Sequence, residues 1–282
     1  MPMRRVLRSF AALVCLLATL AALAAQANGP VPAGHESTVT RLEVAGREVE
    51  LVIPPSAPAP GARALLVVLH GGLGNARHVR ASLQMDPMAE KYGFLIAYLN
   101  GYPSPMNERM KTWNAGTCCG PAQRMGSDDL GYIVAATQAI AARPGVRPDH
   151  IVGLGHSNGA MMTQRVMCES GLYQAAVAVA GSLELAVDTC PAARGRRILA
   201  IHGMADENVP IGGGYGKGLA GVPFRSAADS ERIFERSGAF YRLWLVPGVA
   251  HMPQSLREAI ARAGGSMQED IVSFLGLARA DR

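Results

Sequence analysis

The chain has 282 residues, of which 49% are hydrophobic and 17% charged, so it is neither disordered nor a coiled coil. Its 32 glycines and 18 prolines follow no period, which excludes a collagen-like protein. Outside residues 1–27 the chain has 24 basic and 22 acidic residues, and it shows no basic cluster interleaved with aromatics, so we expect no nucleic-acid partner.

The amino-terminal segment resembles an export signal. Arg4, Arg5 and Arg8 precede an apolar run from Phe10 to Ala25, and the small-x-small triplet Ala25-Gln26-Ala27 follows. This pattern predicts a signal peptide, residues 1–27, and a secreted or periplasmic protein. The alternative is a membrane anchor, but the run is borderline in length and rich in weakly hydrophobic alanine. No later segment is long and apolar enough to cross a bilayer.

Residues 28–282 are predicted to form one domain of alternating strands and helices. The predicted strands are Thr38–Val44, Arg47–Ile53, Leu65–Leu69, Phe94–Leu99, Ile151–Leu154, Ala175–Ala180, Arg197–Ile201 and Tyr241–Val246. The predicted helices are 76–91, 127–143, 158–169, 227–236 and two short ones near the end, and residues 100–126 are expected to form a long loop. The first two strands should form a hairpin. The alternation predicts an α/β fold with an eight-stranded, mostly parallel sheet and helices on both faces.

Four cysteines remain after the signal segment: Cys118, Cys119, Cys168 and Cys190. An even number in an exported protein suggests two disulfides. A bond between neighbouring cysteines needs a strained eight-membered ring, so Cys118 and Cys119 are each expected to reach a distant partner. Four buried thiols are the alternative. A metal site is not expected, because the chain has no CxxC and no histidine at ligand spacing near these cysteines.

The motif that carries chemistry is Gly155-His156-Ser157-Asn158-Gly159, a G-x-S-x-G sequence. It follows an apolar strand and precedes a helix, which is the setting of a nucleophile elbow. There the serine lies on a sharp turn with its hydroxyl exposed. A side chain at either glycine would collide with the neighbouring strand or helix.

A serine hydroxyl needs a base to remove its proton. In this fold the partners follow in the order acid, then histidine, after later strands. Asp206 follows strand Arg197–Ile201, and His251 follows strand Tyr241–Val246. We therefore expect Ser157 to be the nucleophile, His251 the general base and acid, and Asp206 the residue that orients the imidazole.

Other titratable residues fit these roles less well. Asp188 follows a strand that comes too early, and Asp128 and Asp129 are placed as helix-start acids. His70 and His202 end strands and are expected to form local hydrogen bonds. The remaining histidines, His35, His78 and His150, are expected at the surface.

The backbone N–H groups that stabilise an oxyanion should come from two places. One is Asn158, directly after the nucleophile. The other is Gly72 or Leu73, in the glycine-rich loop that follows strand Leu65–Leu69. A phosphate-binding loop is the alternative, but no dinucleotide or P-loop pattern follows, so no cofactor is expected.

Several motifs together resemble the secreted polyhydroxybutyrate-depolymerase-like and feruloyl-esterase-like α/β-hydrolases over roughly residues 40–275. They are His70-Gly71-Gly72, Trp113-Asn114-Ala115-Gly116 with Cys118-Cys119-Gly120, Ser127-Asp128-Asp129, the motif around Ser157 extended to Met162, and His202-Gly203 with Asp206 and Val209-Pro210. The resemblance implies an α/β-hydrolase fold, hydrolysis of carboxylic esters and the same three catalytic residues. Relatives often have Gly-Gly-Gly-His followed by Trp-Pro where this chain has Gly-Val-Ala-His251-Met252-Pro253, and the stretch from Asp206 to His251 is short.

The expected partner is an ester substrate: a 3-hydroxybutyrate-type ester or oligomer, or a feruloyl or acetyl ester of a plant polysaccharide. Trp113 and the Cys118-Cys119 loop are expected to border the substrate pocket, because they follow the carboxyl end of a predicted strand. His156 belongs to the turn that carries Ser157 and is expected to line the pocket from there. Two further hypotheses stay open. The same chemistry would serve a serine peptidase or amidase, and a hydrolase fold can also be a non-catalytic binding module.

Overall fold

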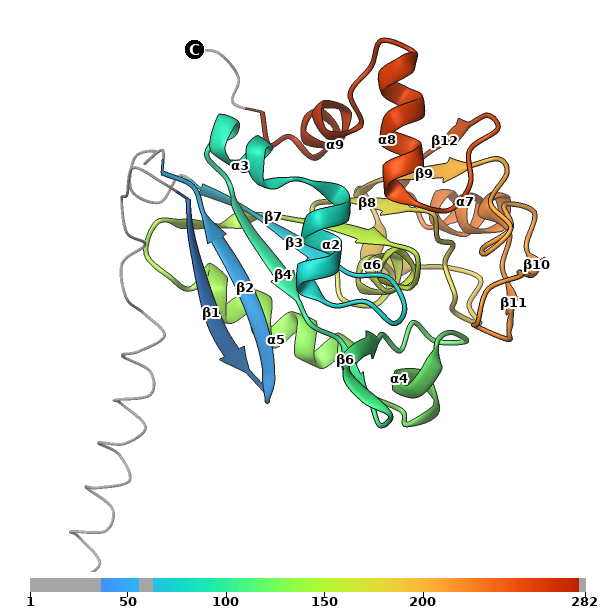
Figure 1. Cartoon of the computed structure of the whole chain (residues 1–282), viewed down its shortest axis with the longest axis horizontal. Coiled ribbons are helices and arrows are strands. Elements are labelled where there is room, and N and C mark those ends of the chain that lie inside the picture. Colours follow the sequence, from blue (N-terminus) through green and yellow to red (C-terminus); the bar gives the residue numbers. More distant parts are fainter. Residues whose placement is uncertain (1–36, 56–62, 279–282) are drawn as a thin grey trace, which may run out of the picture.

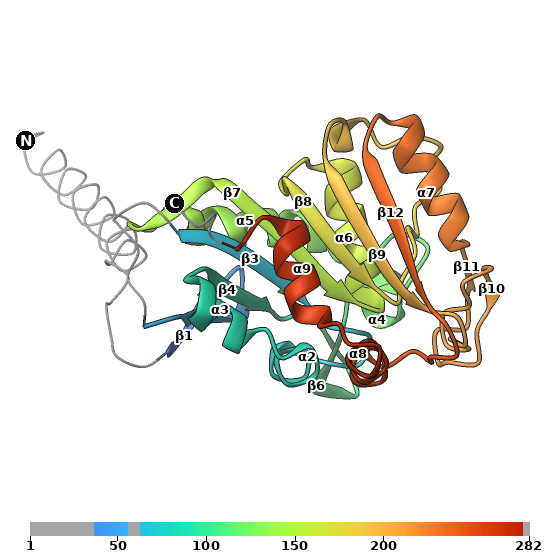
Figure 2. The same ribbon diagram turned by 90° about the horizontal axis from the view of Figure 1, so that it is seen from above.

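The computed structural model describes residues 37–55 and 63–278. The predicted signal peptide, residues 1–27, lies outside these ranges. The described chain folds around an eight-stranded sheet with the strand order β1-β2-β4-β3-β7-β8-β9-β12 (Figures 1 and 2). These strands are β1 (Thr38–Val44), β2 (Arg47–Ile53), β3 (Arg63–Leu69), β4 (Leu95–Leu99), β7 (Val146–His156), β8 (Ala175–Val179), β9 (Arg197–Gly203) and β12 (Phe240–Val246).

The first two strands form the predicted hairpin. They pair antiparallel with Val44 opposite Arg47, and the two residues between them, Ala45 and Gly46, both have positive φ angles of 49° and 73°. Two positive φ angles are typical of the tight turn whose twist matches that of the strands. β2 continues antiparallel onto β4, and every later pairing in this sheet is parallel. The predicted fold class is therefore confirmed.

The parallel strands β3, β4, β8 and β9 are buried on both faces because helices cover both sides of the sheet. In β3, Leu65, Val67 and Leu69 belong to one core cluster, whereas Leu66 and Val68 belong to the other. The first cluster includes residues of α5 (Asp129–Ala141), α6 (Asn158–Glu169) and α7 (Ala227–Arg236). The second includes residues of α2 (Ala76–Leu83), α3 (Asp86–Tyr92), α8 (Pro253–Arg262) and α9 (Met267–Leu275). Figure 2 shows these helix layers on opposite sides of the sheet.

Two segments differ from the prediction. The expected helix 76–91 is divided into α2 and α3, because Gln84 adopts a left-handed conformation that ends α2 and Pro87 lies in the first turn of α3. The expected loop 100–126 contains regular elements: the antiparallel pair β5 (Tyr102–Ser104) and β6 (Asn107–Thr112), followed by α4 (Gly120–Arg124). A second small pair, β10 (Gly214–Tyr215) and β11 (Pro223–Phe224), lies between β9 and α7.

The disulfides also correct the prediction in part. The structure pairs Cys168, near the end of α6, with Cys190, which precedes the short 3-10 helix Pro191–Ala193. It pairs Cys118 with its neighbour Cys119, so the expectation of distant partners for these two was wrong. Helix α6 packs against the 3-10 helix and brings Cys168 and Cys190 together. With Cys168 and Cys190 bonded to each other, Cys118 and Cys119 remain as partners in the buried turn that follows Trp113.

No helix in the ranges 37–55 and 63–278 has the length and apolar character to cross a membrane. Within the same ranges, no three histidine, cysteine or acidic side chains are grouped so that they could hold a metal ion.

Candidate active site

Ser157 lies at the sharp turn between β7 and α6. Its φ and ψ angles are 53° and −122°, a conformation that residues other than glycine rarely adopt. A Cβ atom on Gly155 would overlap the carbonyl oxygen of Gly159, and one on Gly159 would overlap the carbonyl oxygens of Leu69 and His70. Both glycines are therefore required for the helix to approach β3 and β7 closely, as the sequence indicates.

The turn brings Ser157 to a histidine that lies 94 residues later in the chain. His251 Nε2 is 2.9 Å from Ser157 Oγ, and His251 Nδ1 is 2.7 Å from Asp206 Oδ2. His251 is 8% exposed and Asp206 is 5% exposed. With Nδ1–H donated to the carboxylate, Nε2 is free to accept the proton of the serine hydroxyl. This is the geometry needed to activate a serine nucleophile.

Asp206 is held as a carboxylate by several donors. Its Oδ1 accepts hydrogen bonds of 2.9 Å from the backbone N–H groups of Asn208 and Val209, and His202 Nε2 lies 3.2 Å from its Oδ2. Burial alone would raise the pKa of Asp206. The hydrogen bonds from His202, His251 and Val209 outweigh burial and lower its pKa below the usual range. Asp206 therefore stays charged wherever His251 can act as a base.

The structure places the other acidic residues away from this histidine. Asp188 is exposed, and Asp128 caps the start of α5 through the N–H of Gly131. Asp129 is buried, where it pairs with Arg47 and accepts a hydrogen bond of 2.6 Å from the backbone N–H of Asn114. Asp206 is the carboxylate that reaches His251.

His70 and His202 form local hydrogen bonds, as expected. His70 Nε2 accepts from the N–H of Gly101 at 3.0 Å, so its Nδ1–H donates to the carbonyl oxygen of Gly71 at 2.7 Å. Burial lowers the pKa of His70 to about 3. His202 Nε2 lies 2.9 Å from the carbonyl oxygen of Val209. Of the histidines expected at the surface, His78 is exposed, His150 is half-buried, and His35 lies outside the described residues.

The glycine-rich loop after β3 lies directly against the nucleophile. A Cβ atom on Gly71 would be 3.3 Å from Ser157 Cβ, and one on Gly72 would be 3.7 Å from Asn158 Cβ. Leu73 has a positive φ of 60°, and the N–H of Gly74 closes the turn onto the carbonyl oxygen of Gly71 at 3.0 Å. The loop thus brings its backbone to the side of Ser157 where N–H groups could stabilise an oxyanion.

His156 lines the cleft but is 8% exposed, and its Nε2–H donates to the carbonyl oxygen of His251 at 3.2 Å. Burial, and then the nearby positive charge that His251 can carry, lower the pKa of His156 to about 3. A neutral His156 therefore supports the backbone of the segment that carries the catalytic imidazole.

Trp113 was expected to line the pocket, and this expectation was wrong. Its side chain is fully buried, stacks on Tyr132 and donates from Nε1 to the carbonyl oxygen of His70 at 2.9 Å. The Asn158 side chain bonds both backbone groups of Trp113, accepting from its N–H at 2.7 Å and donating to its carbonyl oxygen at 2.9 Å. Its inward position is favoured because burial removes the large apolar area of the indole ring from water. The sequence analysis did not predict this role of the Asn158 side chain, because only the fold brings Asn158 and Trp113 together.

A cleft of about 1150 Å³ opens above Ser157. Most of its wall is apolar and comes from the loops between strands. The apolar residues are Leu73, Val79, Ala81, Pro105, Met106, Met110, Pro121, Met161, Val209, Leu219, Ala220, Phe224 and Met252, and Cys119 also contributes. The contributions of Met161, Leu219 and Phe224 follow only from the fold, which brings their distant segments to the same cleft.

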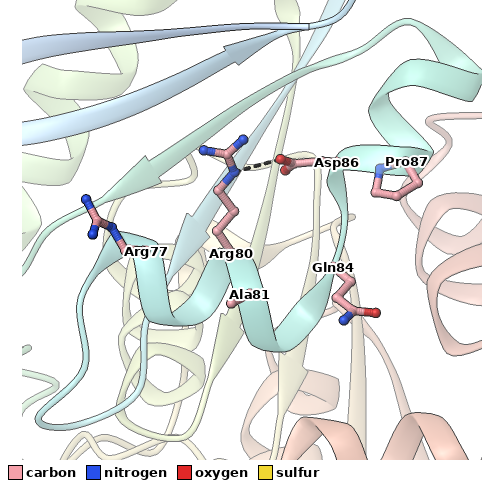
Figure 3. A pocket seen from close by; sticks show the side chains of 6 residues that line it. All are labelled: Arg77, Arg80, Ala81, Gln84, Asp86 and Pro87. Atoms are coloured by element: carbon pink, nitrogen blue, oxygen red, sulfur yellow. Dashed lines mark hydrogen bonds and ion pairs between the residues drawn. The ribbon is translucent and has the colours of Figure 1, made fainter.

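A second, smaller pocket of about 420 Å³ lies at the junction of α2 and α3 (Figure 3). Arg77, Arg80, Gln84 and Asp86 line it, and Arg80 is paired with Asp86 at 2.6 Å. None of the three residues proposed for catalysis contributes to it.

The chain is similar to several known proteins. Residues 120–191 match the prolyl oligopeptidase family. The chain is 30% identical over 181 residues to NocK of Nocardia uniformis subsp. tsuyamanensis, a protein that carries the name of an esterase, and the match covers 63% of this chain and 51% of NocK. It is 28% identical over 182 residues to feruloyl esterase B of Piromyces equi, with 63% of this chain and 32% of that protein covered.

The chain thus spans about half the length of NocK and about a third of feruloyl esterase B. Among solved structures, the acetyl xylan esterase of Aspergillus awamori matches 86% of this chain and 100% of its own, with a TM-score of 0.59 and 14% identity. This structural likeness shows the α/β-hydrolase fold, and the sequence matches point to esterase-like members of that fold.

Proposed function

We propose that this esterase-like α/β-hydrolase is a secreted serine esterase that cleaves carboxylic esters through Ser157, His251 and Asp206. The observation that carries the proposal is the pair of hydrogen bonds that joins Ser157 Oγ, the two ring nitrogens of His251 and Asp206. A hydroxyl, a base and an orienting carboxylate in this arrangement form the constellation of acyl-transfer enzymes.

In the proposed reaction, Ser157 Oγ attacks the ester carbonyl carbon while its proton passes to His251 Nε2. The negative charge on the carbonyl oxygen is stabilised by the N–H of Asn158 and by that of Gly72 or Leu73. The carbon–oxygen bond to the alcohol then breaks, and His251 gives its proton to the leaving oxygen. A water molecule, deprotonated by His251, attacks the acyl-enzyme and releases the acid and free Ser157.

The cleft supports a preference among ester substrates. Its walls are mainly aliphatic and thioether side chains, with Phe224 as the aromatic ring among the lining residues described. Such a surface suits the methyl-bearing chain of a 3-hydroxybutyrate-type ester or oligomer, which is our leading substrate class.

A feruloyl or acetyl-xylan ester is the second candidate, supported by the similarity to feruloyl esterase B and to the acetyl xylan esterase structure. A substrate panel of 3-hydroxybutyrate oligomers, methyl ferulate and acetylated xylan separates the two. The higher kcat/KM identifies the substrate class.

A peptidase or amidase is a third candidate, because residues 120–191 match the prolyl oligopeptidase family. Comparing p-nitrophenyl esters with matched peptide anilides tests it, and a faster reaction with the anilides would contradict the esterase proposal.

Titration with an organophosphonate tests for a working nucleophile. We expect one adduct per chain, on Ser157, detected by mass spectrometry of the intact protein and its peptides. A chain that forms no adduct and hydrolyses no ester would instead be a non-catalytic binding module.

A further inference from the structure

The cleft above Ser157 carries one permanently charged side chain. Among the described residues that line it, Arg124 is the only arginine, and no lysine, aspartate or glutamate contributes. The other polar groups of the wall are neutral hydroxyls and amides, together with histidines. Because no carboxylate is among the described residues that line the cleft, Arg124 creates a local positive potential there.

Arg124 is also unpaired within the described chain. Several other arginines of the chain form ion pairs: Arg47 pairs with Asp129, Arg80 with Asp86, and Arg165 with Glu169. Arg124 takes part in none of these ion pairs and is exposed to solvent. Its guanidinium is therefore available to a ligand in the cleft.

The position of Arg124 is set by a supported segment. It is the last residue of α4, whose Ala122 N–H donates to Thr112 Oγ1 on β6 at 3.0 Å. The residue before Thr112 on β6, Lys111, donates its N–H to the carbonyl oxygen of Gly74 at 3.0 Å. Gly74 ends the glycine-rich loop beside Ser157. Two hydrogen bonds thus connect the helix that carries Arg124 to the loop proposed to hold the oxyanion.

We propose that Arg124 is a specificity-determining residue that binds a free carboxylate on the substrate, so that the site prefers esters that are also acids. The proposal rests on the esterase function above and specifies its substrates. A guanidinium presents paired N–H donors that match the two oxygens of a carboxylate. An oligomer of a hydroxy acid ends in such a carboxylate. The neighbouring apolar residues, Met106, Met110 and Pro121, would contact the carbon chain between the carboxylate and the scissile ester.

The test compares acids with their neutral esters. The first pair is the linear dimer of 3-hydroxybutyrate and its methyl ester. The second pair is monoethyl suberate and diethyl suberate. For the intact protein, kcat/KM should be higher for the acid than for the neutral ester in at least one pair. In Arg124→Gln the ratio of acid to neutral ester should fall about tenfold, as expected for loss of a charge-assisted hydrogen-bonded contact.

Two variants and a salt titration sharpen this result. Arg124→Lys keeps the charge but not the paired donors, so its ratio should lie between those of the intact protein and Arg124→Gln. Arg77→Gln removes the same charge from the smaller pocket at α2 and should leave the ratio unchanged (Figure 3). Raising the ionic strength from about 0.01 M to about 1 M shortens the screening length about tenfold and should reduce the preference for the acid in the intact protein.

The role of Arg124 would be overturned if the intact protein and Arg124→Gln showed the same ratio of kcat/KM for the acid to kcat/KM for the neutral ester. The esterase function would still stand, because both proteins would hydrolyse the esters. If the intact protein hydrolyses no ester in either pair and no p-nitrophenyl ester, the esterase function itself fails. The neutral esters therefore separate failure of the inference from failure of the proposed function.

Discussion

The floor and the rim of the cleft are built differently. On the floor, Asp206 and His251 are nearly buried, and hydrogen bonds from backbone and side chains hold them. On the rim, Met106 is 93% exposed and Leu219 is 91% exposed. Met106 lies in the turn that joins β5 to β6, and Leu219 lies in the connection from β10 to β11. Packing and hydrogen bonds fix the side chains of the floor, whereas the exposed side chains of the rim can be replaced with little loss of stability. We infer that the floor sets the reaction and the rim sets the substrate, a division common in enzymes whose binding loops lie on a rigid scaffold.

The largest effect should come from the floor. Ser157→Ala removes the attacking oxygen, so ester hydrolysis should fall by about 10⁴-fold or more while the fold is retained. Turnover of a p-nitrophenyl ester and the circular dichroism spectrum measure the two properties. Near-normal turnover would show that another residue is the nucleophile.

Asp206→Asn should have the next largest effect. The amide keeps the shape of the side chain but favours the wrong tautomer of His251, an effect of about 10⁴-fold in a well-studied serine protease. The matched control is Asp188→Asn, since Asp188 is exposed and follows the preceding strand. We expect kcat/KM to drop only for Asp206→Asn. A drop in kcat/KM for Asp188→Asn instead would show that Asp188 is the acid that supports His251.

The backbone of the floor can be tested through its glycines. Gly159→Ala places a methyl group on the carbonyl oxygens of Leu69 and His70, so it should lower the free energy of unfolding by about 3 kcal/mol or more. At the exposed Gly212, between β9 and β10, a Cβ atom meets nothing within 4 Å. Gly212→Ala should change stability by less than about 0.5 kcal/mol in urea denaturation. Equal effects of the two changes would contradict the close packing of the floor at Gly159.

The buried histidines of the floor predict sensitivity to acid. The pKa values of His70 and His156 are lowered to about 3, whereas the unfolded chain binds these protons near pH 6.5. Unfolding therefore takes up protons between about pH 6.5 and 3, and stability should fall as the pH is lowered through this window. Each histidine contributes a slope of at most about 1.4 kcal/mol per pH unit.

His156→Gln should make this dependence shallower. Urea denaturation at several pH values measures the slope. Identical slopes in the intact protein and His156→Gln would show that His156 does not resist protonation.

The smallest effect is expected on the rim. Met106→Ser replaces an exposed side chain, so stability should change by less than about 0.5 kcal/mol. Hydrolysis of short-chain esters should change less than hydrolysis of long-chain esters, because only a long chain extends to the rim. A kcat/KM series over chain length measures this, and a uniform loss at every length would place Met106 closer to the chemistry than we propose.

Much of the scaffold could be predicted from local patterns. Helices 158–169 and 227–236 and the hairpin strands have the bounds that the sequence suggests, because apolar periodicity and turn residues act over a few neighbours. The helix 76–91 failed as one element, since Pro87 permits a new helix to begin at Asp86 but not a continuous one.

Ser157, Asp206 and His251 could be proposed from the sequence because each follows a recognisable strand. Parallel strands carry their carboxyl ends to one edge of the sheet, so order along the chain is enough to bring such residues together. The pairing of Cys118 with Cys119, the inward position of Trp113 and the exposure of Arg124 in the cleft were decided only by the tertiary structure. These features depend on which distant surfaces pack against residues 100–126, and no local periodicity encodes such contacts.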